Sequence, residues 1–404
     1  MGKIDLFLEN ILGRRVRPDL SPLRSALIEA GFSEGDFTKV LVTGTNGKGS
    51  TSFIFHSILK IAGLKSGLLT SPHICSVTER IKIDGSLHEE EWIEALENYL
   101  PIIRRYSLTY YEITVLLTFH FFRKYGVDTG IMETGMGGRW DGSNVFGGEY
   151  GIITSVGLDH SEFLGNSLRQ IFIEKVEILR RSRAGVSGVS RKFFREVDFY
   201  PPEGIYFFNE DFNYRKGGRI STFRIRDIAF KIPGLSPLPQ WHRSVAMALM
   251  GAYLILGREA LMKKKNEIEN SLPLLKIPGR WDLRIIDEKE VLLDVAHNPQ
   301  AWSRLIQNVY RYFTEGEEPV WIIGVLRDKN WRYLFNKLEG KEVFYVEVGP
   351  EERRLTFEMV SDRYPYVRYC PGVKECIAGI RSRKVVVTGS FYTVAQAVCP
   401  ELKT

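Results

Sequence analysis

The sequence has 404 residues, of which 44% are hydrophobic and 26% charged, a composition typical of a globular protein and unlike that of a disordered chain. Its net charge of +6, from 55 basic and 49 acidic residues, comes without the long basic runs of a dedicated nucleic-acid binder and suits an anionic small-molecule substrate. A chain of this length exceeds one typical core, so two or three domains are expected at about 150 residues each.

The cysteines and the N-terminus indicate a cytoplasmic protein. The four cysteines, Cys75, Cys370, Cys376 and Cys399, form no CxxC pair and no metal-ligand spacing, so free thiols in a reducing compartment are expected. The N-terminal MGKIDLFLENILGRR is too charged for a signal peptide, and no apolar run approaches the ~18 residues of a membrane span. We therefore expect a cytoplasmic enzyme that contacts neither a membrane nor nucleic acid.

The first clear feature along the chain is the stretch VTGTNGKGSTSF, from Val42 to Phe53. The apolar residues before it predict a buried strand, and those after it recur at helical spacing. A tight strand-to-helix turn directs several backbone N–H groups and the positive end of a helix dipole at one point, which suits a phosphate. Lys48 adds a point charge for phosphate oxygens, and Ser50 or Thr51 can offer a hydroxyl to magnesium. The spacing GxxGKGS is a variant of the P-loop; the alternative is a glycine-rich turn that binds nothing.

Short apolar runs alternate with amphipathic stretches through the first half of the chain, which predicts a parallel sheet covered by helices. The expected strands are Lys39–Thr43, Ser66–Leu69, Thr129–Glu133 and Ile152–Val156, and the expected helices are Glu90–Tyr106 and Glu112–Tyr125. From about Ser187 to Pro239, including the segments YFFN and STFRIRDIAFKIPG, alternating residues predict an antiparallel patch. Helical periodicity returns at Val245–Leu256.

Ionisable residues follow several of these strands, at the edge where parallel sheets bind ligands. Glu133 ends one strand and precedes the glycines of TGMGGRWD, so it is either a second anchor for magnesium or an exposed acid beside a flexible loop. The pair Asp159-His160 follows another strand and could serve as metal ligand or base, although a lone histidine is usually neither. Lys175 lies in a helical pattern, where spacing alone indicates a solvated charge.

A second α/β series follows the turn-like KIPGR, which places a domain boundary near Pro278. Its expected strands are Val291–Val295, Val320–Val325, Glu342–Val348 and Lys384–Thr388. Here PGR and LDVAHNP put Arg280, Asp294, His297 and Asn298 at loop positions. Arginine can grip a phosphate with two hydrogen bonds, as a closing domain would require. The alternative is an ordinary turn in which Asp294 caps the next helix.

Together, in order and along nearly the whole chain, these stretches resemble the folylpolyglutamate synthase/dihydrofolate synthase family of the Mur ligase superfamily. The matching motifs are TGTNGKGS, SPHICSVTERI, LTYYE, ETGMGGRWDGSN, GLDHSEFLG, IEKVEIL, PGRWD, LDVAHNP, GVLRDKN and VTGSFY. The first marks the superfamily. The second, Ser71–Ile81, is more specific because it is similar to the loop that this family uses near folate.

The resemblance implies an ATP-dependent ligase. The γ-phosphate of ATP goes to a carboxylate of a folate or of dihydropteroate, the amine of L-glutamate attacks the acyl phosphate, and the tetrahedral intermediate collapses to an amide. The implied cofactors are ATP and Mg²⁺ at two sites, with a monovalent cation left open, and a monomer is expected. Two other functions stay open: a Mur-type amide ligase acting on a cell-wall precursor, and a P-loop ATP-binding protein without ligase chemistry. The Ser71–Ile81 loop argues against the first, and the set His160, Lys175, Asp294 and His297 against the second.

Carried over position by position, the resemblance implies roles for the following residues. The implied catalytic residues are Lys48, His160, Lys175 and His297. The implied ATP-binding residues are Thr45, Asn46, Gly47, Lys48, Gly49, Ser50, Thr51, Arg280, Asp294 and Asn298. The implied folate-binding residues are Ser71, Pro72, His73, Glu79, Arg80, Thr109, Tyr110, Tyr111, Glu112, Trp140, Asp141 and Gly142. The implied magnesium ligands are Ser50, Ser71, Glu133, His160 and Lys175, and Lys175 matches the lysine that becomes carbamylated in this family.

The expected fold is α/β with two domains. Residues 1–277 would form a P-loop-type, doubly wound, mostly parallel sheet that binds ATP and folate, and residues 278–404 a smaller Rossmann-like glutamate-ligase domain, with the active site between them. Three positions depart from the family pattern. No asparagine lies near Ala246, Val176-Glu177 follows Lys175 in place of Ala-Gly, and Gln300 replaces a second histidine.

Overall fold

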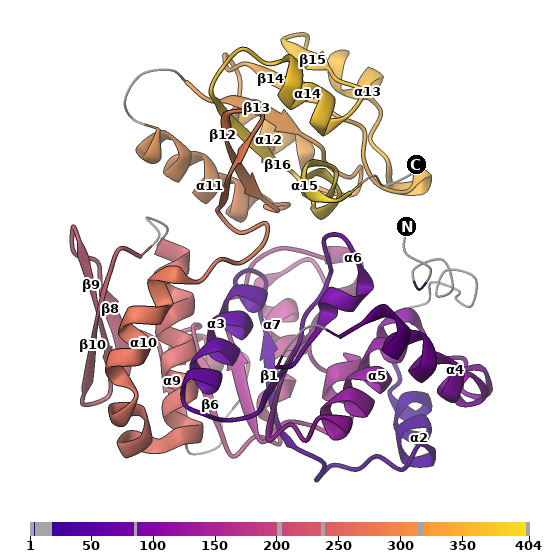
Figure 1. Ribbon diagram of the computed structural model, residues 1–404, viewed down its shortest axis with the longest axis vertical. Coiled ribbons are helices and arrows are strands. Elements are labelled where there is room, and N and C mark those ends of the chain that lie inside the picture. Colours follow the sequence, from indigo (N-terminus) through magenta and orange to yellow (C-terminus); the bar gives the residue numbers. More distant parts are fainter. Residues whose placement is uncertain are drawn as a thin grey trace. The chain divides into compact units, whose positions relative to one another are not determined.

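The computed structural model describes residues 4, 18–84, 87–199, 204–235, 239–313 and 318–400 (Figure 1). The chain forms two compact units, Met1–Leu275 and Lys276–Thr404, and each is described here by itself. The predicted boundary at Pro278 lies just inside the second unit.

The first unit is built on a seven-stranded sheet with the order β3-β2-β4-β1-β5-β6-β7. Its strands are β1 Thr38–Thr43, β2 Ser66–Leu69, β3 Ile81–Lys82, β4 Thr129–Glu133, β5 Tyr150–Ile153, β6 Ala184–Ser187 and β7 Ile205–Phe207. All neighbouring strands pair in parallel except β2 and β3, which are antiparallel. The prediction of a doubly wound, mostly parallel sheet is confirmed.

Helices pack on both faces of this sheet. They are α2 Ser21–Glu29, α3 Lys48–Ile61, α4 Glu89–Arg105, α5 Tyr110–Lys124, α6 Ser161–Leu164, α7 Leu168–Val176, α8 Arg191–Glu196, α9 Pro239–Lys263 and α10 Lys265–Ser271, with short 3₁₀ turns η1 Val77–Arg80, η2 Gly142–Asn144, η3 Glu177–Leu179 and η4 Leu272–Leu274. The two predicted helices correspond to α4 and α5 and end within two residues of the expected bounds. Apolar and aromatic side chains of α2, α4 and α5 share one core with β1, β2 and β4.

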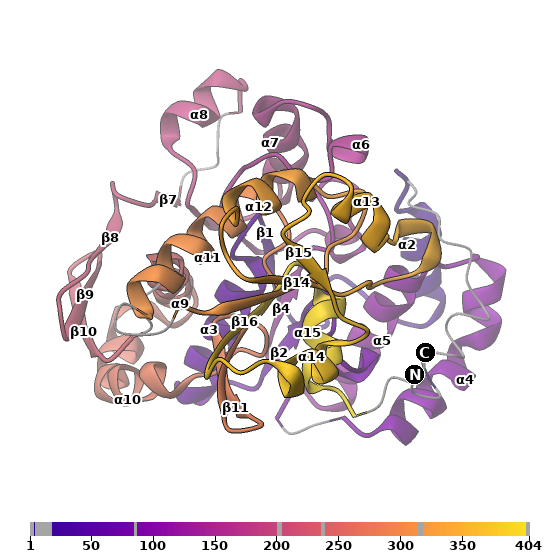
Figure 2. The same ribbon diagram turned by 90° about the horizontal axis from the view of Figure 1, so that it is seen from above.

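The predicted antiparallel patch is only partly confirmed. Strands β8 Phe212–Arg215, β9 Ile220–Ile225 and β10 Ile228–Pro233 form a separate antiparallel sheet that lies beside α9 and α10 (Figures 1 and 2). The prediction is wrong for YFFN, because β7 pairs in parallel with β6 and extends the large sheet. Its alternating apolar residues suit either pairing, so the pattern alone did not separate the two.

One described helix, Gln240–Lys263, is long and apolar enough to cross a membrane by length and composition. Its backbone leaves helical geometry at Gly257, where φ is 74° and ψ is 175°. Val245 to Met250 are almost completely buried, and the helix packs against α3, β6 and the small antiparallel sheet. Its apolar side chains therefore contribute to the core of the first unit.

Two of the four cysteines are confirmed as free thiols. Cys370 and Cys376 lie buried in the second unit.

The second unit is a six-stranded sheet with the order β11-β12-β16-β13-β14-β15, parallel except for the pair β11–β12, which confirms a Rossmann-like α/β fold. Its elements are β11 Asp282–Ile286, β12 Lys289–Asp294, α11 Pro299–Tyr312, β13 Val320–Ile323, α12 Trp331–Lys337, β14 Val343–Tyr345, η5 Glu351–Arg353, α13 Phe357–Ser361, β15 Val367–Tyr369, α14 Val373–Gly379, β16 Lys384–Thr388 and α15 Phe391–Val398. Trp302, Trp321 and Tyr345 are buried in its core.

Strand register brings the motifs to one edge in each unit. Thr43 pairs with Ile153 and Leu69 with Met132, so the loops after β1, β2, β4 and β5 leave the sheet together. In the second unit Asp294 pairs with Thr388, which places the loops after β12 and β16 side by side. These are the carboxyl edges at which parallel sheets bind ligands.

Candidate active site

The turn between β1 and α3 has the geometry of a phosphate-binding loop. Gly47 precedes the first residue of α3 with φ of 90°, a left-handed conformation that glycine adopts without strain. Gly44 has φ of 150°, and a Cβ there would lie 1.9 Å from Thr154 Oγ1. Both glycines are therefore required by the path of the loop, which aims the first-turn N–H groups of α3 at one point.

Residues after β5 hold this loop in place. Thr45 Oγ1 donates to Gly157 O at 3.0 Å and accepts from Gly157 N at 2.9 Å. Asn46 N donates to Ser155 Oγ at 2.9 Å, and Asn46 O accepts from the hydroxyls of Thr154 and Ser155. The side chain of Thr45 thus shapes the loop. The segment after β5, which was expected to continue the strand as far as Val156, supports it.

Lys48 and two hydroxyl residues begin α3. Lys48 Nζ donates to Gly44 O at 2.9 Å, so the ammonium curls back over the loop. Ser50 is largely buried and Thr51 completely so. Among the described residues Thr51 Oγ1 has no hydrogen-bond partner. Burying a hydroxyl without a hydrogen bond costs free energy, so native structures rarely do it. A hydroxyl that lacks a protein partner at this position fits a phosphate or metal ligand.

The carboxylate of Glu133 lies against the first turn of α3. A Cβ on Gly49 would be 3.3 Å from Glu133 Oε2, and the same oxygen accepts from Ser71 N at 3.2 Å. Glu133 is 3% exposed. The structure therefore brings together the ends of β2 and β4 and the start of α3, and with them three residues of the predicted magnesium set, Ser50, Ser71 and Glu133.

Lys175 is a buried lysine beside other charges of this site. Its side chain is 3% exposed in α7. Burial, and then the nearby Lys48 ammonium, lower the pKa of Lys175 to about 7, while Asp159 and Asp141 act in the opposite direction. The interpretation of Lys175 as a solvated charge, which spacing alone favoured, is wrong because α7 turns this side chain inward. The charge of Asp159, which the sequence offered with His160 as a possible metal ligand or base, thus acts on Lys175.

The extra carboxylate after Lys175 is neutralised by arginines. Glu177 accepts from Arg180 Nε at 2.8 Å and Nη2 at 2.7 Å, and it lies 3.4 Å from Arg139. Arg139 also pairs with Glu174 at 3.4 Å and donates its backbone N–H to Glu174 O at 2.9 Å. These contacts join the glycine loop after β4 to α7, and they direct the carboxylate of Glu177 to the arginines.

His160 lies in the loop after β5 with φ of 52°, in the left-handed region that non-glycine residues seldom adopt. Its backbone N donates to Asp159 Oδ1 at 3.0 Å, and its carbonyl accepts from Phe163 and Leu164 at the start of α6. Strained backbone of this kind clusters at functional sites. The observation favours a role for the Asp159-His160 pair.

The loop after β2 is organised by Glu79. Its Oε1 accepts from Cys75 N at 2.8 Å and Ser76 N at 3.0 Å, and its Oε2 accepts from Ile74 N at 2.9 Å. Three backbone amides thus share one carboxylate. In the same loop the bond between Ser71 and Pro72 is cis.

Arg80 occupies the inner side of this loop. Its Nε donates to His73 Nδ1 at 3.0 Å, and its guanidinium lies 4.7 Å from the centre of the Tyr110 ring. Burial, followed by the charge of Arg80, lowers the pKa of His73 to about 4, so His73 is neutral at pH 7. Four predicted folate residues, Ser71, His73, Arg80 and Tyr110, therefore lie in one neighbourhood.

The remaining folate candidates lie at the start of α5 and in the glycine loop. Thr109 and Glu112 form a capping box, in which Glu112 Oε2 accepts from Thr109 N at 2.7 Å. Tyr111 OH donates to Glu133 O at 2.7 Å. Asp141 accepts from Met136 N, Ser143 N and Ser143 Oγ, and burial raises the pKa of its carboxyl. Glu112 and Asp141 thus support the backbone locally, while Tyr111 connects this region to the Glu133 strand.

Two members of the predicted set differ in exposure. Trp140 is 48% exposed, whereas Gly142 is buried with an added Cβ only 3.3 Å from Leu23. Trp140 is therefore accessible to a ligand, and Gly142 is closely packed against Leu23 and Val115.

The helix expected to contact adenine presents different side chains to the P-loop. Ala246 is fully buried in α9. A Cβ on Gly47 would lie 3.6 Å from Ser244 Oγ and 3.8 Å from Gln240 Nε2. Gln240 therefore supplies a carboxamide near the loop, earlier on the helix than the position at which the resemblance leads one to expect an asparagine.

In the second unit Asp294 connects two predicted loops. Its Oδ2 accepts from Trp281 N and its Oδ1 from Ala296 N, both at 2.9 Å, and Gly279 O accepts from Val295 N at 2.9 Å. Burial raises the pKa of Asp294, and the charge of Arg280 opposes this shift. These hydrogen bonds hold the PGRWD and LDVAHNP loops against each other.

The ring of Phe391 lies near both Arg280 and His297. Its ring centre is 5.3 Å from the Arg280 guanidinium and 6.2 Å from the His297 ring. His297 Nδ1 is 2.9 Å from Val295 O, a carbonyl that can only accept, so Nδ1 carries the proton. Asn298 caps α11 by accepting from Ala301 N at 3.0 Å. Phe391 was quoted within VTGSFY but given no role, because an aromatic residue at the start of a helix is normally core.

No cluster of three or more His, Cys, Asp or Glu side chains suited to a metal is present in the described residues. The oxygen donors gathered around Glu133, together with the hydroxyl of Thr51, nevertheless fit a cation that binds few protein ligands and retains water and phosphate oxygens, as Mg²⁺ does.

Comparisons with known proteins agree with this geometry. Residues 42–191 match the family model of the Mur ligase middle domain. The Escherichia coli (strain K12) dihydrofolate synthase/folylpolyglutamate synthase is 28% identical over 405 residues, which cover 97% of this chain and 93% of that protein. The solved structure of E. coli FolC in complex with DHPP and ADP matches with a TM-score of 0.82 and 25% identity, covering 98% of this chain and 97% of that chain.

A third match is the Yersinia pestis bifunctional folylpolyglutamate synthase/dihydrofolate synthase complexed with AMPPNP and Mn ion. It has a TM-score of 0.81 at 24% identity and covers 98% of this chain and 96% of that chain, which shows the shared fold.

Proposed function

We propose that this chain, which belongs to the folylpolyglutamate synthase/dihydrofolate synthase family of the Mur ligase superfamily, is an ATP-dependent ligase that adds L-glutamate to a folate and also to dihydropteroate. The observation that carries the proposal is the arrangement at the start of α3. There a P-loop lysine, the Glu133 carboxylate and the buried Lys175 meet at the carboxyl edge of one sheet.

The proposed reaction activates a carboxylate that is otherwise a poor acyl donor. The γ-phosphoryl group of ATP passes to the folate carboxylate, giving an acyl phosphate and ADP. The neutral amine of glutamate then attacks the acyl carbon, and the tetrahedral intermediate expels inorganic phosphate and loses a proton to leave an amide. Phosphoryl transfer depends on positioning and on cations around the phosphate oxygens.

The residues of the first unit supply these conditions. Backbone N–H groups of Gly47 to Ser50 and the Lys48 ammonium would hold the ATP phosphates. The oxygens of Ser50, Ser71 and Glu133, together with His160 and a carbamylated Lys175, would hold Mg²⁺, with Thr51 offering a further hydroxyl. Bound there, magnesium would neutralise developing charge on the phosphate oxygens. Arg280, Asp294 and His297 would act from the second unit, with Phe391 orienting Arg280 and His297.

A glutamate-incorporation assay tests the proposal. Purified protein is incubated with radiolabelled L-glutamate, ATP and Mg²⁺, with dihydropteroate and a reduced folate as acceptors in parallel. We expect labelled product and an equal amount of ADP with both acceptors, and none without ATP. Product with the reduced folate alone would overturn the dihydropteroate part, and ADP release that ignores both acceptors would overturn the ligase.

Glu79 offers a test of the folate loop. Replacing Glu79 by Gln leaves one oxygen to accept from three amides, so the loop after β2 should lose its conformation. Because the loss of one or two charge-assisted hydrogen bonds costs about 1.5–3 kcal/mol each, we expect KM for the folate to rise at least ~10-fold while KM for ATP changes less than about twofold. Initial rates against each substrate measure this.

The matched control is Glu90→Gln, which removes the same charge from an exposed position in the first turn of α4. It should leave both constants unchanged. An equal rise of both KM values in Glu79→Gln would contradict a role confined to the folate loop.

We further propose that the enzyme acts as a monomer in the cytoplasm. The site assembled above uses residues of this chain only, and both nucleotide and glutamate are small molecules that need no macromolecular partner.

A further inference from the structure

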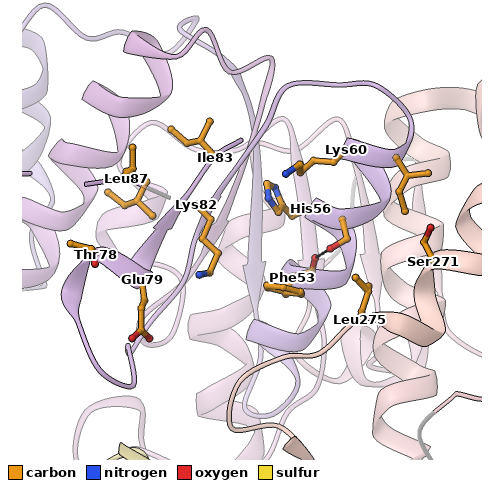
Figure 3. Close-up of a pocket in the computed structure, with 13 residues that line it drawn as sticks. Phe53, His56, Lys60, Thr78, Glu79, Lys82, Ile83, Leu87, Ser271 and Leu275 are labelled. Atoms are coloured by element: carbon orange, nitrogen blue, oxygen red, sulfur yellow. Dashed lines mark hydrogen bonds between the residues drawn. The ribbon is translucent and has the colours of Figure 1, made fainter. Parts of the chain in front are cut away.

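The charged groups around the cavity between α3 and β3 compensate one another (Figure 3). This cavity has a volume of about 600 Å³ and is lined by Lys60 of α3 and by Glu79 and Lys82 of the η1–β3 stretch. Burial lowers the pKa of Lys82, and the negative charge of the nearby Glu79 opposes this shift. Lys60 pairs with Asp84 at 2.8 Å. The positive charge of the chain is therefore not concentrated at this cavity.

Most of the net charge of the chain lies instead in the small antiparallel sheet formed by β8, β9 and β10. Between Phe212 and Pro233 there are six basic residues and one acidic residue, so this segment carries a net charge of +5, whereas the whole chain carries +6. The acidic residue, Asp227, pairs with Arg258 of α9. The sheet is therefore a local concentration of positive charge on a chain that is otherwise nearly neutral.

The basic side chains share the outer face of this sheet. Buried and exposed residues alternate along β9 and β10, so the apolar side chains point inward and the basic ones outward. Arg215 and Lys231 both lie opposite Thr222 in one row across the strands, and Arg224 lies in the next row. The basic face is defined here as the exposed residues Arg215, Lys216, Arg219, Arg224 and Lys231.

The inner face of the sheet is held by α9. Ser221 Oγ lies 2.7 Å from His242 Nε2. The His242 ring stacks on Phe223, with the ring centres 5.9 Å apart, and lies 5.3 Å from the ring centre of Tyr214. In Figure 1 the sheet lies at the border of the first unit, beyond α9 and α10. These contacts attach the sheet to the first unit and leave the basic face directed outward.

Neighbouring acidic residues do not neutralise the basic face. Asp211 and Glu269, which lie next to the sheet, are paired with arginine and lysine side chains outside this face. No ion pair among the described residues involves Arg215, Arg219 or Arg224. Like charges on neighbouring strands destabilise a sheet, so a negatively charged ligand on this face would be favourable.

The chemistry of the face favours carboxylates over other anions. A guanidinium binds a carboxylate with two hydrogen bonds, and alternate side chains of an extended segment are about 6.8 Å apart, as the two rows of this face are. Proteins that bind single-stranded nucleic acid on a sheet stack its bases on exposed aromatic rings. The outward residues of β9 and β10, all described, are Ile220, Thr222, Arg224, Ala229, Lys231 and Pro233. They offer no ring for stacking and little apolar surface for entry into a membrane.

We propose that the basic face is a docking surface for an acidic segment of another protein, a run of aspartates and glutamates in extended conformation. Arg215 and Arg224, which lie in neighbouring rows, would each bind a carboxylate of this segment. Arg219 and Lys216, in the turn between β8 and β9, would extend the contact. The inference goes beyond the proposed ligase activity and does not depend on it.

The test measures binding of a fluorescein-labelled peptide of eight alternating aspartates and glutamates by fluorescence anisotropy. Because two exposed charge pairs are lost, we expect the Kd of the double variant Arg215→Gln/Arg224→Gln to be about 10-fold higher than that of the wild type. The Kd should also rise with added salt, which screens exposed charges. The matched control Arg363→Gln/Arg381→Gln removes two exposed arginines of the second unit and should leave the Kd within about twofold.

An equal loss of binding in both double variants would show that the peptide responds only to the net charge of the chain, and this would overturn the docking surface. Binding needs no substrate and no turnover. Failure of glutamate addition would therefore refute the proposed function and leave this measurement intact.

Competition on the wild type covers a double variant that does not fold. Unlabelled acidic peptide should displace the labelled peptide at least ~10-fold more effectively than an eight-nucleotide oligothymidylate or vesicles of phosphatidylserine and phosphatidylcholine. Stronger displacement by the oligonucleotide would assign the face to nucleic acid, and stronger displacement by the vesicles would assign it to a membrane. Self-association of the wild type that the acidic peptide abolishes would assign it to a second copy of this chain. Each of these three results would overturn the proposal.

Discussion

Replacing Lys48 by Met is expected to reduce ATP-dependent glutamate addition at least ~10³-fold, which corresponds to about 4 kcal/mol of lost transition-state stabilisation. Lys48 Nζ lies 2.9 Å from Gly44 O, so the substitution removes a cation that is positioned to neutralise the transferring phosphoryl group. Methionine keeps the length and apolar stem of the side chain. Glutamate incorporation at saturating ATP and folate measures the loss.

The control for Lys48 is Lys65→Met, which removes an exposed lysine close behind the same helix. It should retain wild-type activity. Thermal unfolding of both variants should match wild type, because methionine keeps the apolar stem of the lysine that it replaces. Near-normal glutamate addition by Lys48→Met would show that ATP is not activated at this turn, and the proposed mechanism would fail.

Long buried elements were predictable from the sequence, and short or partly exposed ones were not. β1, β2 and β4 are fully or almost fully buried runs of apolar residues, and the predicted bounds agree with the structure to within one residue. β5 ends at Ile153 and not at Val156, because Thr154 and Ser155 leave the sheet to hydrogen-bond the P-loop. Tertiary contacts there override a continuous strand pattern.

Strands β3 and β11 were not predicted, for a different reason. β3 consists of Ile81 and Lys82 alone, and β11 carries Ile285 with 75% exposure. Edge strands of this kind are determined by the neighbour they pair with and not by their own residues. A single sequence contains little signal for them.

Some residues of the candidate site could likewise be predicted from the sequence and others could not. Glu133 and Asp294 could be predicted as site residues because each stands at the end of an apolar strand pattern. Such a pattern shows where the carboxyl edge of a parallel sheet lies. Sequence spacing did not reveal that Glu79 and Glu112 bond to local backbone amides, or that Lys175 points inward, because each depends on how a loop or helix is rotated. Phe391 was missed for the same reason.

Lys175→Ala is expected to lose glutamate addition by about 10²–10³-fold and to recover at least tenfold when a short carboxylate such as acetate or propionate is added. The reason is that a carbamate forms from a neutral amine and CO₂ with release of one proton, which turns a cation into an anion able to bind magnesium. In the truncated variant an added carboxylate can enter the vacated space beside Lys48 and replace that anion. Activity against carboxylate concentration measures the recovery.

Lys175→Arg is the matched control, because it keeps a cation, cannot be carbamylated and leaves no space for an added acid. It should be inactive with and without acetate. Rescue of the arginine variant, or wild-type turnover by Lys175→Ala, would rule out the carbamate role.

Because its pKa is lowered, carbamylation of Lys175 should depend on pH near neutrality, and this can be measured without turnover. An ordinary lysine with pKa near 10.4 is neutral in roughly one molecule in a thousand or fewer at pH 7, whereas a pKa of about 7 leaves about half of the molecules neutral. Carbamylation should therefore increase as pH rises from 6 to 8 at constant dissolved CO₂. ¹³C NMR of the wild type equilibrated with ¹³C-labelled CO₂ should show a carbamate signal that grows over this interval and is absent from Lys175→Arg. A signal that first appears above pH 9 would mean that Lys175 behaves as an ordinary lysine, and the burial and the Lys48 charge would then have no chemical consequence.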